Sequence, residues 1–288
     1  MKSAPFEYRR PTSLEEAAAL LSEHHGEAKI LAGGQTLVPL LNFRLAAPSI
    51  LVDINEIEGL DGIELRDDGL NLGALVRWHQ IEASRTIQAA NPLLSEAIKH
   101  IAHYQIRNRG TWAGSCAHAD PAAEFPAVAI VSGARFGVYS TRQRRTIEAH
   151  DFFVGSLTTV LEPDEILTDV TFPAWPAGRR WAFEEFSLRP GDFAIAGVAT
   201  LIDGLGDAVS CRLVCFGVGE KPSRLTNAEG IIASEGLARN AIARAAAAAA
   251  VEVDAQTDIH ASADYRHALV EVLVERTVLC AAGLESPQ

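Results

Sequence analysis

The sequence is poor in cysteine, and this scarcity excludes several kinds of site. Four cysteines are spread along 288 residues, and no two of them have the Cys-x-x-Cys spacing. They are too few and too scattered for a disulfide framework, and we expect no zinc or iron–sulfur site within this chain. Cys211 and Cys215 lie on a predicted strand, four residues apart and on one face, so we interpret them as packing residues.

Basic charge and long apolar runs are also scarce. The chain has 25 Lys and Arg against 37 Asp and Glu, a formal net charge of −12, which argues against a nucleic-acid-binding surface. No window approaches the roughly 18 uninterrupted apolar residues of a membrane span, and the first residues lack the apolar core of a signal peptide. We therefore expect a cytoplasmic protein that binds neither nucleic acid nor membrane.

Several catalytic and nucleotide-binding motifs are missing. The sequence has no Gly-x-Ser-x-Gly turn and no phosphate loop. Gly204-Leu205-Gly206 is the nearest match to the Rossmann fingerprint, but it lacks the third glycine and precedes a strand. His100 and His103 lie three residues apart on a predicted helix, without an evident third metal ligand. We therefore expect neither catalytic residues nor metal ligands in this chain.

What the sequence does contain is two short glycine-rich turns. The first covers residues 32–36 and lies between two apolar stretches; the second covers residues 111–115 and follows a basic stretch at 107–109. Glycine lets backbone N–H groups approach a bound oxyanion, and small hydroxyls add donors. Either turn alone could simply reverse the chain. Together, two such turns could hold one extended ligand, such as the diphosphate of a dinucleotide.

The pattern along the chain predicts an α+β fold. A compact β-α-β unit of about 55 residues comes first, with a helix that begins at Ser13 in a capping box. Pro121 is expected to start another helix with Asp120 as its N-cap. Three antiparallel strands are predicted near 181–189, 194–201 and 209–217, with a turn at 203–207 between the second and the third. Three helices follow, near 227–235, 240–251 and 263–282.

The two turns and their flanks resemble a known family, the FAD-binding medium subunit of the molybdenum hydroxylases. Its members include carbon monoxide dehydrogenase and the flavin domain of xanthine dehydrogenase. The matching segments are KILAGGQTLVP at 29–39 with LVDIN at 51–55, IRNRGTWAGS at 106–115 with AHADPAAE at 117–124, and SLRPGDFA at 187–194. Their order and spacing agree along nearly the entire chain.

The resemblance implies a two-part FAD-binding unit of the vanillyl-alcohol-oxidase type, followed by a small C-terminal domain with the three-stranded sheet and helices. We place the FAD-binding domain at 1–177, with subdomains at about 1–57 and 58–177, and the C-terminal domain at 178–288. Residues 173–178, which are rich in proline, form the expected linker.

The resemblance also implies a set of FAD-binding residues. Both turns would hold the diphosphate through backbone amides, Glu124 would contact the sugar region, Leu167 would pack near the adenine, and Phe193 would lie close to the isoalloxazine ring. The complete set of candidates is Leu31, Ala32, Gly33, Gly34, Gln35, Thr36, Leu37, Thr111, Trp112, Ala113, Gly114, Ser115, His118, Asp120, Glu124, Leu167 and Phe193.

Two departures from the family pattern bear on cofactor contacts. Relatives usually have Thr-Ile-Gly-Gly at the second turn, so Trp112 and Ala113 are expected to add bulk beside the cofactor. Relatives often carry a lysine in the segment occupied here by Glu184 and Glu185, and the loss of a cation near the flavin would disfavour its anionic reduced form.

The function that the resemblance implies is electron transfer within an oxidoreductase complex. Substrate is oxidised at a molybdenum–pterin cofactor in a large partner subunit, and electrons pass through iron–sulfur clusters of a small partner subunit to FAD in this chain. The expected assembly is a dimer of heterotrimers. Two alternatives remain at this stage: a stand-alone FAD-dependent oxidoreductase, and a flavin-free scaffold subunit, which the bulk of Trp112 raises.

Overall fold

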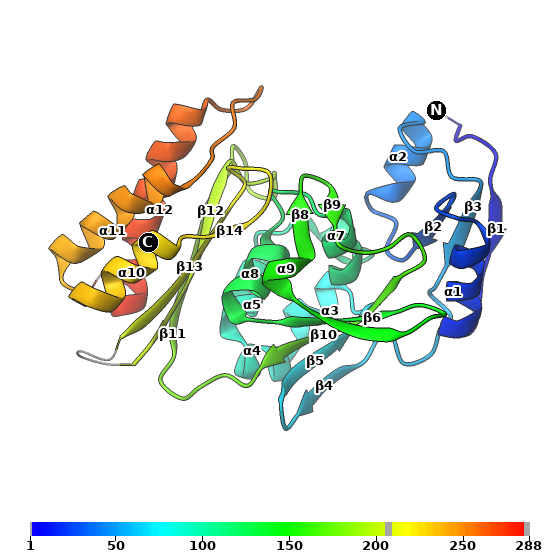
Figure 1. The fold of residues 1–288 in the computed structure, drawn as a ribbon, viewed down its shortest axis with the longest axis horizontal. Coiled ribbons are helices and arrows are strands. Elements are labelled where there is room, and N and C mark those ends of the chain that lie inside the picture. The colour runs from blue at the N-terminus through cyan, green and yellow to red at the C-terminus, as the bar shows by residue number, and fades with distance from the viewer. Residues whose placement is uncertain (1, 205–208, 285–288) are drawn as a thin grey trace.

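Three sheets follow one another along the molecule, as Figure 1 shows for the computed structural model. The structure describes residues 2–204 and 209–284. The predicted turn at 203–207 therefore lies partly outside the described residues, as do Leu205 and Gly206 of the weak Rossmann match. The buried apolar side chains form three clusters, and the C-terminal sheet contributes to two of them, one on each of its faces.

The N-terminal unit is a small parallel sheet covered by helix α1 (Leu14–Glu23). Its strands are β1 (Glu7–Arg9), β2 (Ala28–Leu31) and β3 (Ile50–Asp53), in the order β1-β3-β2. All residues of the central strand β3 are buried, which fits its continuous apolar sequence. Ser13 caps α1 as predicted, because its side chain accepts a hydrogen bond from the N–H of Glu16.

The middle unit is built on a five-stranded antiparallel sheet in the order β4-β5-β10-β6-β7. These strands are β4 (Ile63–Arg66), β5 (Gly69–Gly73), β6 (Arg135–Tyr139), β7 (Arg144–Glu148) and β10 (Ile166–Pro173). A smaller pair is formed by β8 (Phe153–Gly155) and β9 (Thr158–Thr159). The helices of this unit are α3 (Trp78–Ala83), α4 (Arg85–Ala90), α5 (Pro92–Ala97), α6 (Tyr104–Arg107), α7 (Trp112–His118), α8 (Glu124–Ser132) and α9 (Ala149–Phe152).

Helix α8 joins the middle unit to the C-terminal unit. All of its residues are buried, which is expected for a helix that is apolar on every side. It packs on one face of the C-terminal sheet, against β12 and β13, while the helices of the C-terminal unit cover the other face. The C-terminal sheet is therefore the middle layer of a helix–sheet–helix arrangement.

The C-terminal sheet has four antiparallel strands, so the prediction of three was wrong by one. Its strands are β11 (Arg180–Phe186), β12 (Ala196–Asp203), β13 (Ser210–Phe216) and β14 (Ser223–Arg224). The fourth strand pairs with β13 over two residues only, which is too short to show the alternation of apolar and polar residues that predicts a strand. The helices α10 (Thr226–Glu235), α11 (Arg239–Glu252) and α12 (Ala263–Ala282) follow as predicted. Cys211 and Cys215 are buried, which confirms their interpretation as packing residues.

Two local predictions were wrong. Asp120 does not cap a helix: α8 begins at Glu124, and the Asp120 carboxylate instead accepts a hydrogen bond from the N–H of Ala122 at 2.9 Å, closing a tight turn. His100 and His103 do not share a helix either, because α5 ends at Ala97 and His103 is the N-cap of α6. Over residues 2–204 and 209–284, no His, Cys, Asp and Glu side chains gather in a metal-binding group, and no helix has the length and hydropathy needed to cross a bilayer.

Candidate cofactor site between two glycine turns

The two glycine-rich turns lie side by side, although they are far apart in the sequence. A Cβ atom on Gly33 would be only 2.3 Å from the carbonyl oxygen of Arg109 and 2.8 Å from the Cα of Gly110. Any other residue at 33 would therefore push the first turn away from the chain that leads into the second. Because Gly33 has no side chain, the backbones of the N-terminal and middle units can contact each other directly at this point.

The first turn opens into a pocket of about 370 Å³. Arg109 from the second segment is one of its walls, so both segments build it. The residues that line it are Leu31, Ala32, Gly33, Gly34, Gln35, Val38, Pro39, Asn42, Asp53, Asn55 and Arg109. Gly34 has a φ of +71°, a conformation that favours glycine, and the side chain of Gln35 folds back to donate to the carbonyl of Gly33 at 3.2 Å. The lining thus combines the glycine-rich turn with apolar and polar side chains and with one arginine, Arg109.

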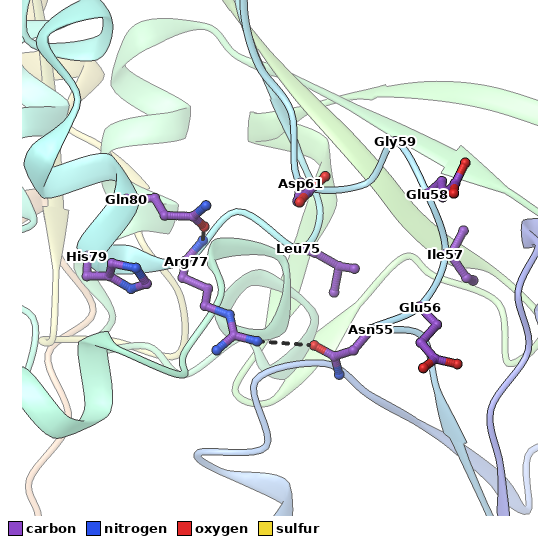
Figure 2. A pocket seen from close by; sticks show the side chains of 10 residues that line it. All are labelled: Asn55, Glu56, Ile57, Glu58, Gly59, Asp61, Leu75, Arg77, His79 and Gln80. Carbon is purple, nitrogen blue, oxygen red and sulfur yellow. Dashed lines mark hydrogen bonds between the residues drawn. The ribbon is translucent and has the colours of Figure 1, made fainter.

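Asn55 links the first turn, through Arg77, to the chain that leads into the second, and it was not among the predicted site residues. Its Nδ2 donates to the carbonyl of Ala32 at 3.0 Å and to Oδ1 of Asp53 at 2.6 Å. The guanidinium of Arg77 reaches Oδ1 of Asn55 at 3.5 Å and the carbonyl of Asn108 at 3.1 Å, as Figure 2 shows for the side chains of Asn55 and Arg77. The sequence did contain a signal that could have identified Asn55 as a site residue. Asp53 and Asn55 form a polar pair two residues apart at the end of a buried strand.

A second pocket, of about 420 Å³, shares Asn55 with the first (Figure 2). It is lined mainly by the loop after β3 and by the start of α3. Its residues are Asn55, Glu56, Ile57, Glu58, Gly59, Asp61, Leu75, Arg77, His79 and Gln80. Three of these side chains are carboxylates against one arginine, Arg77, so this pocket is a poor place for a diphosphate. The pocket beside the first turn has one carboxylate, Asp53, and one arginine, Arg109, and therefore suits an anion better.

Asp53 stays ionised although it is almost fully buried. Burial on its own would raise the pKa of this carboxyl group, but hydrogen bonds from the Tyr8 hydroxyl and from Asn55 outweigh that effect and lower the pKa. The same contact raises the pKa of Tyr8. Asp53 therefore presents a fixed hydrogen-bond acceptor to the pocket, suited to hydroxyl groups of a ligand.

The second turn forms the start of α7, and its two faces differ. The hydroxyl of Thr111 accepts a hydrogen bond from the N–H of Gly114 at 3.2 Å and so caps the helix. Gly114 is exposed and Ser115 is half-buried, so small residues form the open face. A Cβ on Gly114 would meet only the hydroxyl oxygen of Thr111, at 3.1 Å.

Trp112 lies on the other face of α7, inside the core, and does not add bulk at the surface. Its side chain is fully buried, stacks between Phe125 and Phe136, and donates from Nε1 to the carbonyl of Gly73 at 2.6 Å. Ala113 is also buried. The expectation that these two residues crowd a cofactor was therefore wrong, because the helical period turns both of them inward.

The remaining predicted residues are spread over several parts of the structure. Ala32, Gly33, Gly34, Gln35 and Leu31 line the pocket, whereas Thr36 and Leu37 begin the helix that leaves it. His118 and Asp120 lie half-buried at the end of α7 and in the turn that follows it. Leu167 is buried in the middle core and is not among the residues that line the pocket. Phe193 is 67% exposed on the loop between β11 and β12.

Comparison with known proteins identifies the family. Residues 4–175 match the family model described as the FAD binding domain in molybdopterin dehydrogenase, and residues 181–281 match the CO dehydrogenase flavoprotein C-terminal domain. The chain belongs to the family of FAD-binding subunits of molybdenum hydroxylases. As a member of this family it is a flavoprotein subunit of an oxidoreductase, and FAD is its cofactor.

Relatives of known function match this flavoprotein subunit over nearly their whole length. The chain is 42% identical over 280 residues to the 6-hydroxypseudooxynicotine dehydrogenase complex subunit alpha of Paenarthrobacter nicotinovorans, covering 96% of this chain and 95% of that one. It is 36% identical over 274 residues to the carbon monoxide dehydrogenase medium chain of Hydrogenophaga pseudoflava, covering 95% and 96%.

Solved structures of the same family share the fold. A carbon monoxide dehydrogenase from Hydrogenophaga pseudoflava superposes with a TM-score of 0.95 at 37% identity, covering 98% of this chain and 99% of that one. Quinoline 2-oxidoreductase from Pseudomonas putida 86 superposes with a TM-score of 0.93 at 35% identity, with the same coverage. The FAD-binding unit followed by a C-terminal domain, predicted from the resemblance, is thereby confirmed.

Proposed function

We propose that this chain holds FAD across the two glycine turns and passes electrons from iron–sulfur clusters of a small partner subunit through FAD to an external acceptor. The observation that carries this proposal is the close contact of Gly33 with the backbone of Arg109 and Gly110. That contact brings the first turn against the backbone that leads into the second. One extended anionic ligand fits such a pair.

The residues present fit this cofactor. Arg109 and the glycine backbone of residues 32–34 would face the diphosphate, and Asp53 would accept hydrogen bonds from ribose hydroxyl groups. The open face of α7, with Gly114 and Ser115, would lie along the cofactor between its two ends. Glu124 and Phe193 remain our candidates for contacts nearer the flavin, and Leu167 for the adenine end. When bound, the flavin accepts two electrons and releases them singly or as a pair.

The domain division that supports this function is 1–177 for FAD binding, with subdomains at about 1–57 and 58–177, and 178–288 for the C-terminal domain.

Within the first subdomain, α2 (Leu37–Phe43) buries only Leu41. Phe43 and the following Leu45 are 65% and 76% exposed. Apolar side chains on such a helix are typical of a surface that another subunit covers.

We infer a cytoplasmic dimer of heterotrimers, in which each unit combines this chain with an iron–sulfur subunit and a molybdenum-binding large subunit. An electron relay is useful only within tunnelling distance of its donor, so the partners must contact this chain. The test is co-expression with the neighbouring genes, followed by measurement of mass, metal content and dye reduction. A lone monomer that oxidises a substrate unaided would contradict the subunit function.

FAD binding itself has a simpler test. Acid precipitation of the purified chain is expected to release a yellow supernatant that contains FAD, since no covalent attachment is proposed. A colourless protein that takes up no FAD on titration would contradict the proposed site.

A further inference from the structure

The guanidinium of Arg77 makes hydrogen bonds to both units that carry the glycine turns, although Arg77 does not line the pocket beside the first turn. Its Nη1 donates to the carbonyl of Asn108 at 3.1 Å, and its Nη2 donates to Oδ1 of Asn55 at 3.5 Å. Figure 2 shows the guanidinium directed at the Asn55 side chain. One side chain therefore connects the loop after β3 with the segment that leads into the second turn.

The backbone of Arg77 is itself fixed to that second segment. Arg77 forms an isolated antiparallel bridge with Thr111, and the N–H of Trp78 donates to the carbonyl of Gly110 at 3.1 Å. A Cβ on Gly110 would lie 2.9 Å from the indole ring of Trp78, so this ring and the Gly110 backbone are in close contact. The side chain of Gln80 accepts a hydrogen bond from the N–H of Arg77 at 2.8 Å. The guanidinium thus extends from a base that cannot move independently of the second turn.

Asn55 carries the contact from Arg77 to the first turn. Its Nδ2 donates to the carbonyl of Ala32 at 3.0 Å and to Oδ1 of Asp53 at 2.6 Å. A carboxamide has its donors on one atom and its acceptor on the other, so these two bonds leave Oδ1 to face the guanidinium. Hydrogen bonds therefore run without interruption from the backbone at Asn108 to the backbone of the first turn.

This arrangement uses the shape of the guanidinium as well as its charge. Two terminal nitrogens of one planar group donate to acceptors from two different units. A lysine would keep the positive charge, but its single ammonium on a flexible stem lacks this fork. Replacing arginine by lysine therefore separates the effect of position from the effect of charge.

We propose that Arg77 is a positioning residue of the cofactor site, which holds the first glycine turn at a fixed separation from the segment that leads into the second. The inference rests on the proposed FAD site and names a residue that acts on it without touching the ligand. A ligand that bridges two units binds more tightly when their separation is set in advance, because less ordering has to accompany binding. Gly33 permits the close contact, and Arg77 maintains it.

The experiment uses two measurements on the purified full-length chain. FAD affinity is obtained by fluorescence titration, and amide hydrogen exchange of the FAD-free chain is followed in peptides that cover the two turns, because exchange reports local opening. The variants are R77K, R77Q, N55A and the double variant R77Q/N55A. R179K is the matched control, since Arg179 also uses its fork, on Asp203 at 2.7 Å in the C-terminal unit.

R77K and R77Q are both expected to weaken FAD binding about tenfold and to speed exchange in both turns, since neither restores the fork. The double variant R77Q/N55A is also expected to bind about tenfold more weakly than the wild type, well short of the roughly hundredfold loss that independent effects would give. R179K is expected to melt at a lower temperature while keeping wild-type FAD affinity and wild-type exchange in both turns.

Four results would overturn this inference or the function beneath it. If R77K binds FAD as tightly as the wild type while R77Q does not, the charge of Arg77 attracts the diphosphate and the positioning role is refuted. A hundredfold loss in the double variant would show that Arg77 does not act through Asn55. Unchanged exchange in both Arg77 variants would show that this side chain does not hold the turns. If the wild type binds no FAD, the proposed function fails, and the exchange rates of the FAD-free chains still decide whether Arg77 holds the turns.

Discussion

Replacing Trp112 by phenylalanine is expected to lower stability while leaving the FAD affinity of the folded protein unchanged. The indole is fully buried and stacked between Phe125 and Phe136. Phenylalanine would retain one ring and leave a cavity in place of the other, which costs about 2 kcal/mol on the scale of large-to-small core substitutions. The lost hydrogen bond to Gly73 adds about 1 kcal/mol, because that carbonyl keeps its bond from the N–H of Val76.

A total of about 3 kcal/mol corresponds to a fall in melting temperature of about 5–10 °C for a chain of this size. The assay is thermal unfolding of the FAD-free protein, combined with FAD titration well below the melting temperature. Gly114→Ala is the matched variant on the opposite face of α7. It is expected to leave stability unchanged or slightly higher, because alanine favours a helix, and to weaken FAD binding. The reasoning is refuted if Trp112→Phe weakens FAD binding without a loss of stability.

Three further substitutions test other parts of the structure. Gly33→Ala should abolish FAD binding and lower the melting temperature, because its Cβ would lie 2.3 Å from the carbonyl oxygen of Arg109; normal binding would contradict the contact. Asn55→Ala should weaken FAD binding about tenfold, roughly 1.4 kcal/mol, in the same titration. Asp203→Asn should flatten the loss of stability in acid: hydrogen bonds from Arg179 lower the pKa of Asp203, so its contribution, present above about pH 4, is lost as the pH falls through the folded pKa.

Local signals in the sequence predicted the elements well where short-range chemistry decides them. The Ser13 cap and the helix at 263–282 both depend on neighbours within one or two turns. The fourth strand β14 escaped prediction because its two residues are held only by pairing with β13. Asp120 was misplaced because the same side chain can cap a helix or close a turn, and only the later start of α8 decides between them.

The candidate site could be predicted in its segments but not in its geometry. The glycines of both turns were evident in the sequence. The contact of Gly33 with Arg109 was not, because the number of residues between them does not indicate that they meet in the fold. Trp112 shows the converse error, since a bulky residue in the second glycine-rich turn was predicted to lie beside the ligand. The apolar positions 112, 113 and 116 share one helical face, and this period places the indole in the core.

The contact at Gly33 also limits how this flavoprotein can be recombined with its relatives. The N-terminal unit builds most of its apolar core from its own strands and helix, and Leu75 and Ile166 of the following unit complete it. Yet the pocket exists only where its glycine meets the backbone of the following unit at van der Waals distance. A chimera that takes residues 1–57 from another member will therefore bind cofactor only if the donor's turn and the host's 109–110 backbone keep the same separation.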